Sequence, residues 1–199
     1  MKRLVHFLHP ILLPLVLLGA AGPAAAEKAD AYKPTKIDCR ICDADGVTGK
    51  VMMAGEVLLT RGTLSISADR GEVERSPDGY QRATLRADGT NKVRFRQKAD
   101  GPGEQWMEGE AERVEYDEKT AMVKLFGKAR VRRLQDGRLN DEAEGEYIAY
   151  DSRRELFSIR NTNTGEDRAG AGRGSIVIQP RRAAPVGATA NTPMTASTR

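Results

Sequence analysis

Large hydrophobic side chains are scarce in this sequence. The chain contains one Trp, four Phe and five Tyr, and after residue 26 Leu, Ile, Val and Phe together fall below the ~20% at which disorder is usually suspected. The formal net charge of the 199 residues is only +4, whereas disordered chains combine few hydrophobic residues with a high net charge. We therefore expect a thin or open sheet structure whose inner face is partly completed by a bound apolar molecule. The near balance of charge gives no reason to expect nucleic acid as a partner.

The first 26 residues have the features of a secretory signal peptide. A basic start precedes an apolar run over residues 11–18, and three alanines at 24–26 stand just before a charged residue. The alternative is an uncleaved membrane anchor, but Pro14 interrupts the apolar run, which is shorter than the ~20 residues of a spanning helix. We expect cleavage after Ala26 and export to the periplasm.

Histidine is absent after this segment, because the only two, His6 and His9, lie within it. The mature chain would therefore lack the commonest general base and metal ligand. Carboxylates are plentiful, but they are spread along the chain and do not converge, so a solvated sheet face explains them. Notable examples are Glu108, Glu110, Glu112 and Glu115. We expect no catalytic residue, no metal site, no cofactor and no enzymatic activity.

The pattern of the remaining chain is that of short β-strands. Residues 64–68 alternate between aliphatic and polar side chains, which is the period of a strand with one buried face. Clusters of Gly, Pro, Ser and Asp at residues 76–79 and 100–103 are typical of turns. Residues 106–116 are rich in helix formers and are ambiguous by this criterion alone. Many short strands separated by turns predict an all-β fold of antiparallel hairpins.

An internal repeat settles the ambiguous stretch in favour of strands. The segment 110–117 realigns without a gap on the segment 144–151, and each has an aliphatic residue and a Tyr two apart, followed by Asp and a polar turn. A repeated unit of strand, turn and strand indicates stacked hairpins. A shorter echo relates residues 127–131 to residues 55–59.

Two cysteines, Cys39 and Cys42, form a C-x-x-C motif that allows several interpretations. A zinc site would need further Cys or His ligands, which the mature chain lacks. A redox pair needs a thiolate at a helix N-terminus, and no helix signal follows. A local disulfide is awkward if residues 37–42 form one strand, because side chains three apart point to opposite faces unless the strand ends between them. The simplest interpretation is two tolerated small residues, oxidised or not, in an oxidising compartment.

The run over residues 54–70 resembles the signature of the LptA/OstA family of lipopolysaccharide transport proteins. It contains Gly followed by aliphatic alternation, Thr-x-Gly-Thr at residues 60–63, and then Ala-Asp with a basic residue. Residues 108–117 and 123–131 resemble the same family in order and spacing. The resemblance covers about residues 34–160, and it is fairly specific because the motifs recur in sequence.

The resemblance implies an OstA-like fold, an open, twisted antiparallel β jelly roll with an apolar groove for the acyl chains of lipid A in lipopolysaccharide. It also implies β-strand addition at the sheet edges, to further copies in a homo-oligomer and to LptC and LptD-like proteins. Cys39, Cys42 and Thr35 depart from the family pattern and leave the construction of the first edge open. The alternatives to a lipopolysaccharide carrier are a periplasmic β scaffold without lipid and a C-x-x-C thiol oxidoreductase.

The candidates for the lipid-binding face are apolar residues that share one parity along each expected strand. Phe95 and Trp106 could each belong to a ligand platform or to an ordinary core. The candidate lipid-binding residues are Ile37, Met53, Val57, Leu59, Leu64, Ile66, Ala68, Phe95, Val114, Tyr116, Val123, Leu125, Ile148 and Tyr150.

The chain divides into three segments by composition. These are a cleaved signal peptide (1–26), an OstA-like β jelly-roll domain (27–179) and a C-terminal tail (180–199) that is expected to be disordered. The first edge strand should lie near residues 37–42 and the last near 156–159 or 175–178. The run at 175–178 has no charge to block pairing, so it either docks another strand or folds back as an ordinary terminal strand.

Overall fold

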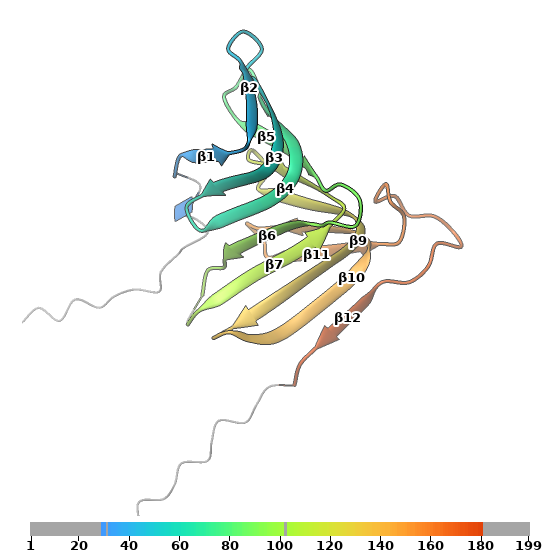
Figure 1. Cartoon of the computed structure of the whole chain (residues 1–199). Coiled ribbons are helices and arrows are strands. Elements are labelled where there is room, and N and C mark those ends of the chain that lie inside the picture. Colours follow the sequence, from blue (N-terminus) through green and yellow to red (C-terminus); the bar gives the residue numbers. More distant parts are fainter. Residues whose placement is uncertain (1–28, 31, 102, 181–199) are drawn as a thin grey trace, which may run out of the picture.

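The computed structural model describes residues 29–30, 32–101 and 103–180, and within them the chain forms twelve antiparallel strands (Figure 1). The strands are β1 (Thr35–Asp38), β2 (Ile41–Asp45), β3 (Lys50–Arg61), β4 (Leu64–Arg75), β5 (Gln81–Arg86), β6 (Val93–Lys98), β7 (Gln105–Ala111), β8 (Arg113–Asp117), β9 (Met122–Gln135), β10 (Arg138–Asp151), β11 (Leu156–Arg160) and β12 (Ser175–Ile178). The predicted all-β fold is confirmed. The expected signal peptide (1–26) and residues 181–199 of the expected tail lie outside the described residues, so the domain boundaries stay predictions.

Four long strands, β3, β4, β9 and β10, each take part in two sheet layers. The first half of β9 pairs with β8 and its second half with β7, and the other three long strands change neighbours in the same way. We call the layer that contains β2, β5, β8 and β11 layer A, and the layer that contains β1, β6, β7 and β12 layer B. Figure 1 shows the two layers set at an angle, as in a jelly roll.

Each crossing between the layers coincides with an irregularity in the strand ladder. The register shifts between Ala54 and Val57 in the β3–β4 pair, and between β9 and β10 in the region of Gly145. At these crossings Gly55 and Gly127 have φ angles of 74° and 77°, and the residue after each is also left-handed. A β-bulge bends the strand and increases its twist. The echo between the two segments that begin at these glycines is therefore a repeated bulge.

The predicted hairpin repeat is confirmed in the β8–β9 and β10–β11 pairs. The Asp117 carboxylate accepts a hydrogen bond from the backbone N–H of Thr120 at 3.0 Å, and the Asp151 carboxylate accepts one from the N–H of Arg154 at 3.1 Å. An Asp side chain that bonds its own turn stabilises a reversal of the chain. The polar turn after each repeated Asp thus has the same construction.

The prediction of one first strand near residues 37–42 is wrong, because the edge is made of two strands. The chain kinks at Cys39 and Arg40, so that β1 pairs with the layer B half of β3 and β2, from Ile41, pairs with the layer A half. The Arg40 N–H donates to the carbonyl of Gly55 at 2.8 Å. The kink therefore follows the bulge of the neighbouring strand.

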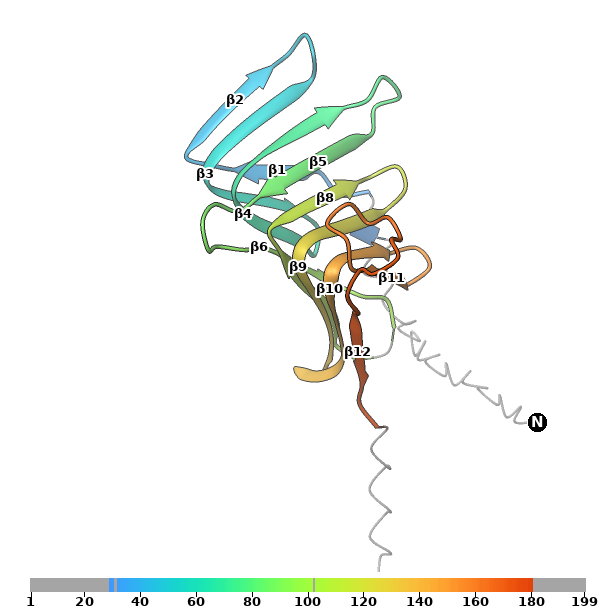
Figure 2. The ribbon, with the colours of Figure 1, turned by 90° about the vertical axis from the view of Figure 1, so that its right-hand side faces the viewer.

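Both candidates for the last strand exist, and each forms an edge. β11 ends layer A and β12 ends layer B, and among the described strands each pairs only with β10. Figure 2 shows β2 and β11 at opposite ends of layer A. The core lies between the layers, where Ile66, Leu85, Val114 and Leu125 are completely buried. No helix in the described part of the chain has the length and apolar character needed to cross a membrane.

Candidate functional site

The inner face of layer A carries two mostly apolar rows that cross all eight of its strand segments. Residues directly opposite each other on paired strands share one face of a sheet, so the rows follow from the register. The first row is Cys42, Met53, Gly71, Leu85, Val114, Leu125, Ile148 and Ile159, and the second is Ala44, Val51, Val73, Ala83, Tyr116, Val123, Tyr150 and Phe157.

Layer B presents an equivalent row to the core. Its members are Ile37, Leu59, Ile66, Phe95, Gly109, Val131, Ala143 and Ile176. The ring of Phe95 occupies the space that a side chain at Gly109 would fill. The inner apolar surface therefore runs from one free edge of the molecule to the other in both layers.

The structure brings the predicted lining residues together between the layers. Those that are buried are Met53, Val57, Leu59, Leu64, Ile66, Phe95, Val114, Val123, Leu125, Ile148 and Tyr150. Ile37, Ala68 and Tyr116 are partly buried and pack against this cluster. Their common orientation is observed, while their contact with lipid stays a prediction.

Over its middle, the inner face is closed by the chain's own side chains. Ile66 of layer B and Val114 of layer A have no exposed surface and belong to one packed cluster. The expectation of an incompletely filled inner face therefore does not hold for the middle of the layers in this structure. Open space is found at the margins.

One margin, which we call the mouth, is a cavity of about 640 Å³ between the hairpin turns of layer A and the strand ends of layer B. Arg61, the last residue of β3, extends across it, and its Nη1 lies 2.6 Å from Oε1 of Glu118, which follows β8. Only 7% and 19% of these two side chains are exposed. The other carboxylate oxygen of Glu118 accepts the N–H of Gln81 at 2.7 Å. The ion pair thus joins layer B to layer A.

Further polar groups surround this ion pair. The Nε of Arg61 donates to the carbonyl of Asp30 at 3.1 Å, and the buried Asp30 carboxylate accepts the N–H and hydroxyl of Thr63 at 2.9 and 2.5 Å. Burial raises the pKa of Tyr116 against the opposing effect of the Arg61 charge. The mouth is therefore a charged rim, with Leu64 as part of its apolar floor.

The second margin lies at the C-terminal edge, where β11 and β12 belong to different layers. A hollow of about 260 Å³ is lined there by Phe157 of layer A and by Val131, Ile176 and Ile178 of layer B, among others. The ring of Tyr150 stacks on Phe157 with ring centroids 4.7 Å apart. The apolar interior thus reaches the surface along this edge.

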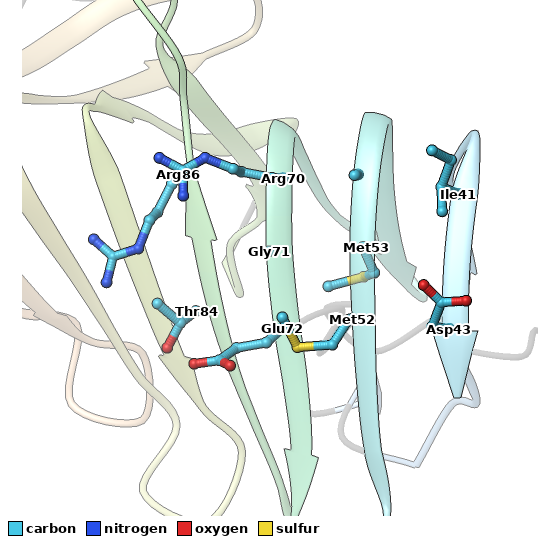
Figure 3. A pocket seen from close by; sticks show the side chains of 10 residues that line it. Ile41, Asp43, Met52, Met53, Arg70, Gly71, Glu72, Thr84 and Arg86 are labelled. Carbon is cyan, nitrogen blue, oxygen red and sulfur yellow. The ribbon is translucent and has the colours of Figure 1, made fainter. Parts of the chain in front are cut away.

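A third hollow, of about 350 Å³, lies beside β2 and is lined mainly by residues of the outer face of layer A (Figure 3). Ile41 and Met52 remain 56% and 48% exposed there. Arg70 and Arg86 face each other across the β4–β5 pair, and Arg70 is ion-paired with Asp88 at 2.7 Å. This hollow opens on the outer face of layer A, and of the first inner row only Met53 and Gly71 reach it.

The outer face of layer B carries alternating charges, as the sequence predicted for the carboxylates. Glu108 lies 3.4 Å from Arg96 and 3.5 Å from Arg132 on the neighbouring strands. Trp106 belongs to this outer face, where the Arg96 guanidinium stands 4.0 Å from the ring centroid. Trp106 therefore does not line the inner face, whereas Phe95 is part of the core.

Cys39 and Cys42 form a disulfide with their Cα atoms 5.8 Å apart. Strand β1 ends at Asp38 and β2 begins at Ile41, so the two cysteines do not lie on one continuous strand, and such a short bridge fits. Cys39 packs against the core and Cys42 is exposed. Cys42 lies in strand β2, and the next described element is strand β3 and not a helix. The described residues contain no group of three or more His, Cys, Asp or Glu that could hold a metal ion. The motif acts here as a covalent link across the kink of the first edge.

Arg61 and Glu118 were missed by the sequence analysis. Arg61 entered as the variable residue of the motif at residues 60–63, and Glu118 belongs to a polar turn whose residues were not singled out. A signal was present, because Arg61 has the same parity as Val57 and Leu59 and therefore points inward.

Comparisons with known proteins agree with the resemblance. The family model "LptA/(LptD N-terminal domain) LPS transport protein" matches residues 36–156. No curated protein sequence matches the chain. The fold is similar to the crystal structure of LptH, the LptA homologous periplasmic component of the lipopolysaccharide transport device of Pseudomonas aeruginosa, with a TM-score of 0.64, 21% identity and coverage of 76% of this chain and 99% of that chain. Because the family model spans more than half of the sequence, this chain belongs to the family of LptA and LptD N-terminal domain lipopolysaccharide transport proteins, which are transport components and not enzymes.

Proposed function

We propose that this protein is a periplasmic carrier that moves lipopolysaccharide from the inner to the outer membrane by holding the acyl chains of lipid A between layers A and B. The observation that carries the proposal is the apolar inner surface, which is continuous across both layers. Burial of apolar surface supplies roughly 25 cal/mol per Å², so acyl chains are the part of lipopolysaccharide that this surface binds. Family membership supports the same substrate.

Acyl chains enter through the margins of the sandwich, because its middle is closed. The C-terminal hollow opens the interior beside Phe157 and Ile176. The bulges at Gly55 and Gly127 lie where the layers meet, so small changes there alter the angle between the layers. The layers part to admit lipid and close again when it leaves.

Assembly of copies extends the apolar surface. An unpaired strand edge offers N–H and C=O groups to another strand. If β11 and β12 of one copy pair with β2 and β1 of the next, Ile159 comes next to Cys42 and Ile176 next to Ile37. The protein then forms a homo-oligomeric bridge, and LptC and LptD-like proteins add to its ends in the same way.

Three observations support a periplasmic location. Residues 1–26 have the pattern of a cleaved signal peptide, and the structurally similar LptH is a periplasmic component. The disulfide is also of the kind that persists in an oxidising compartment.

Photocrosslinking from matched aromatic positions tests lipid binding. Benzoylphenylalanine replaces Tyr116 or Phe157, which face the interior, and Tyr147, which lies on the outer face of layer A beside Phe126, serves as the control. The two inner positions should crosslink lipopolysaccharide and the outer position should not. Equal labelling at all three positions would refute binding between the layers. A delipidated protein that captures no lipopolysaccharide at any position would instead indicate a β scaffold.

A further inference from the structure

The two layers are joined across the mouth by charged groups, although the surface between them is apolar. Arg61 of layer B and Glu118 of layer A form the buried contact, with Nη1 and Oε1 2.6 Å apart. Beyond the mouth, Nη2 of Arg133, a layer B residue of the C-terminal hollow, lies 3.9 Å from Oε2 of Glu155, which lines the mouth and is the last residue of a layer A turn. The other ion pairs discussed above join residues within one layer.

A buried ion pair at this place needs a reason other than stability. The free energy lost when two charges leave water offsets much of the free energy gained from their attraction. Apolar side chains of the same volume therefore often give an equally stable protein. Arg61 stands in a row that continues with Leu64 in the next strand, so an apolar residue would fit the pattern. A buried ion pair is better suited to a switch, because its partners can be exchanged.

The position of the ion pair determines what can replace Glu118. The cavity opens directly onto Arg61 and is about 640 Å³, and its floor leads to the apolar interior. A planar guanidinium binds phosphate and carboxylate groups with two parallel hydrogen bonds. Arg133 lines the C-terminal hollow, four strand spacings or about 19 Å from Arg61. Arg61 is therefore the buried cation that a headgroup in the mouth meets first.

We propose that the Arg61–Glu118 pair is a latch between the layers, and that the anionic headgroup of a bound amphiphile opens it by replacing Glu118 on Arg61. This inference rests on the proposed lipid binding between the layers. When the headgroup phosphate or carboxylate pairs with Arg61, Glu118 returns to solvent with its turn, and layer A moves away from layer B. The acyl chains of the same molecule then occupy the interior. Arg61 is therefore the residue that gives an anionic amphiphile a higher affinity than a neutral one.

Binding of two glycolipids with identical acyl chains, one phosphorylated and one dephosphorylated, tests the latch. Wild type should bind the phosphorylated form about tenfold more tightly, since one charge-assisted hydrogen-bonded pair is involved. Glu118→Gln keeps an acceptor for the Gln81 N–H but removes the competing charge, so it should tighten binding of the phosphorylated form by a further factor of about ten.

The role of the Arg61 charge is tested in a variant that removes both charges of the ion pair. Arg61→Met alone would leave Glu118 buried without its partner, so the double variant Arg61→Met/Glu118→Gln is used. It should bind both glycolipids equally well. Arg82→Met removes an outer-face arginine whose partner, Asp117, is in the same layer, and it should keep the wild-type preference.

The opening itself is measured between spin labels at Lys119 in layer A and Glu104 in layer B, two exposed positions. The two native cysteines are bonded to each other and do not react. The distance should increase with the phosphorylated glycolipid in wild type, and inorganic phosphate alone should leave it unchanged. Opening by inorganic phosphate would indicate a free anion site and overturn the assignment to a headgroup.

The outcomes separate the two proposals. If wild type and variants bind both glycolipids with one affinity, lipid carriage stands and the latch is refuted. A preference for phosphate that survives in the double variant also refutes it, because the anion then binds elsewhere. If no glycolipid binds to any of the proteins, the carrier proposal fails and the latch fails with it.

Discussion

Gly55 and Gly127 occupy equivalent positions in the two halves of the molecule. Each is the first of two consecutive left-handed residues, and each lies where a long strand passes from one layer to the other. A charged side chain covers each glycine, the Arg40 guanidinium over Gly55 and the Glu112 carboxylate over Gly127. The angle between the layers is therefore set twice by the same local conformation.

Alanine at Gly127 should destabilise the fold by about 2 kcal/mol, because a residue with a Cβ is strained at positive φ and would displace Glu112. Urea denaturation measures the change in the free energy of unfolding. Gly46→Ala is the matched control, since Gly46 lies in a turn, lacks a positive φ and has no atom within 4 Å of an added Cβ. It should stay within about 0.5 kcal/mol of wild type. Equal losses in both variants would contradict a special role of the bulge.

Acid should weaken the β8–β9 turn through Asp117. Burial alone would raise the pKa of Asp117, but hydrogen bonds from Arg82 and Thr120 outweigh it and hold this pKa below its usual value. A carboxyl whose pKa is lower in the folded state stabilises the fold above its unfolded pKa, about 3.9, and loses this contribution as the pH falls through the folded value. The gap in unfolding free energy between wild type and Asp117→Ala should be constant from about pH 7 to 5 and shrink below about pH 4. A gap that does not change with pH would contradict the assignment.

Replacing Cys39 and Cys42 with Ser should loosen the first edge without opening the closed middle of the interlayer face. Closing a four-residue loop contributes about 2 kcal/mol in the chain-entropy description. Hydrogen exchange should accelerate in β1 and β2 and remain slow in β9 and β10. Crosslinking of lipopolysaccharide from position 157 should be as efficient in the double variant as in wild type. The wild-type protein should not accelerate the reduction of insulin by a dithiol. Loss of crosslinking in the double variant would show that the pair acts on lipid, and insulin reduction would restore the oxidoreductase alternative.

Sequence reasoning found the strands and the inner face, because alternation along a strand reports directly on burial. It found Ile66 and Leu125 for this reason. It did not find the crossing of the long strands between layers. A bulge at Gly55 shifts which residues point inward, and in the sequence this is visible only as a less regular alternation of apolar and polar residues. Arg61 was lost for a different reason: its inward direction follows from parity, but its partner Glu118 lies 57 positions away and is brought near only by the fold. The two-strand first edge depends likewise on the neighbouring bulge.

The free side of β12 should be needed for assembly, and proline can test that side alone. Gln179 N–H donates to Asn140 at 3.0 Å, and an antiparallel ladder alternates in direction, so the N–H of Val177 points to β10 and that of Ile178 points outward. Ile178→Pro removes an outward donor and should weaken self-association, while the monomer stays folded. Val177→Pro is the control at the adjacent position, because it breaks the bond to β10 and should release β12 from the sheet.

Analytical ultracentrifugation over a concentration series, with hydrogen exchange of β12, distinguishes the two variants. Ile178→Pro should shift assembly to higher concentration with β10 still protected opposite β12. Val177→Pro should lose both assembly and that protection. If Ile178→Pro assembles as wild type does, β12 is an ordinary terminal strand and the contact moves to β11. The N–H of Ile159 in β11 points away from β10, because Ser152 N–H donates to Ala121 of the opposite neighbour and the direction alternates along the ladder. A proline at Ile159 would then be the variant that prevents assembly.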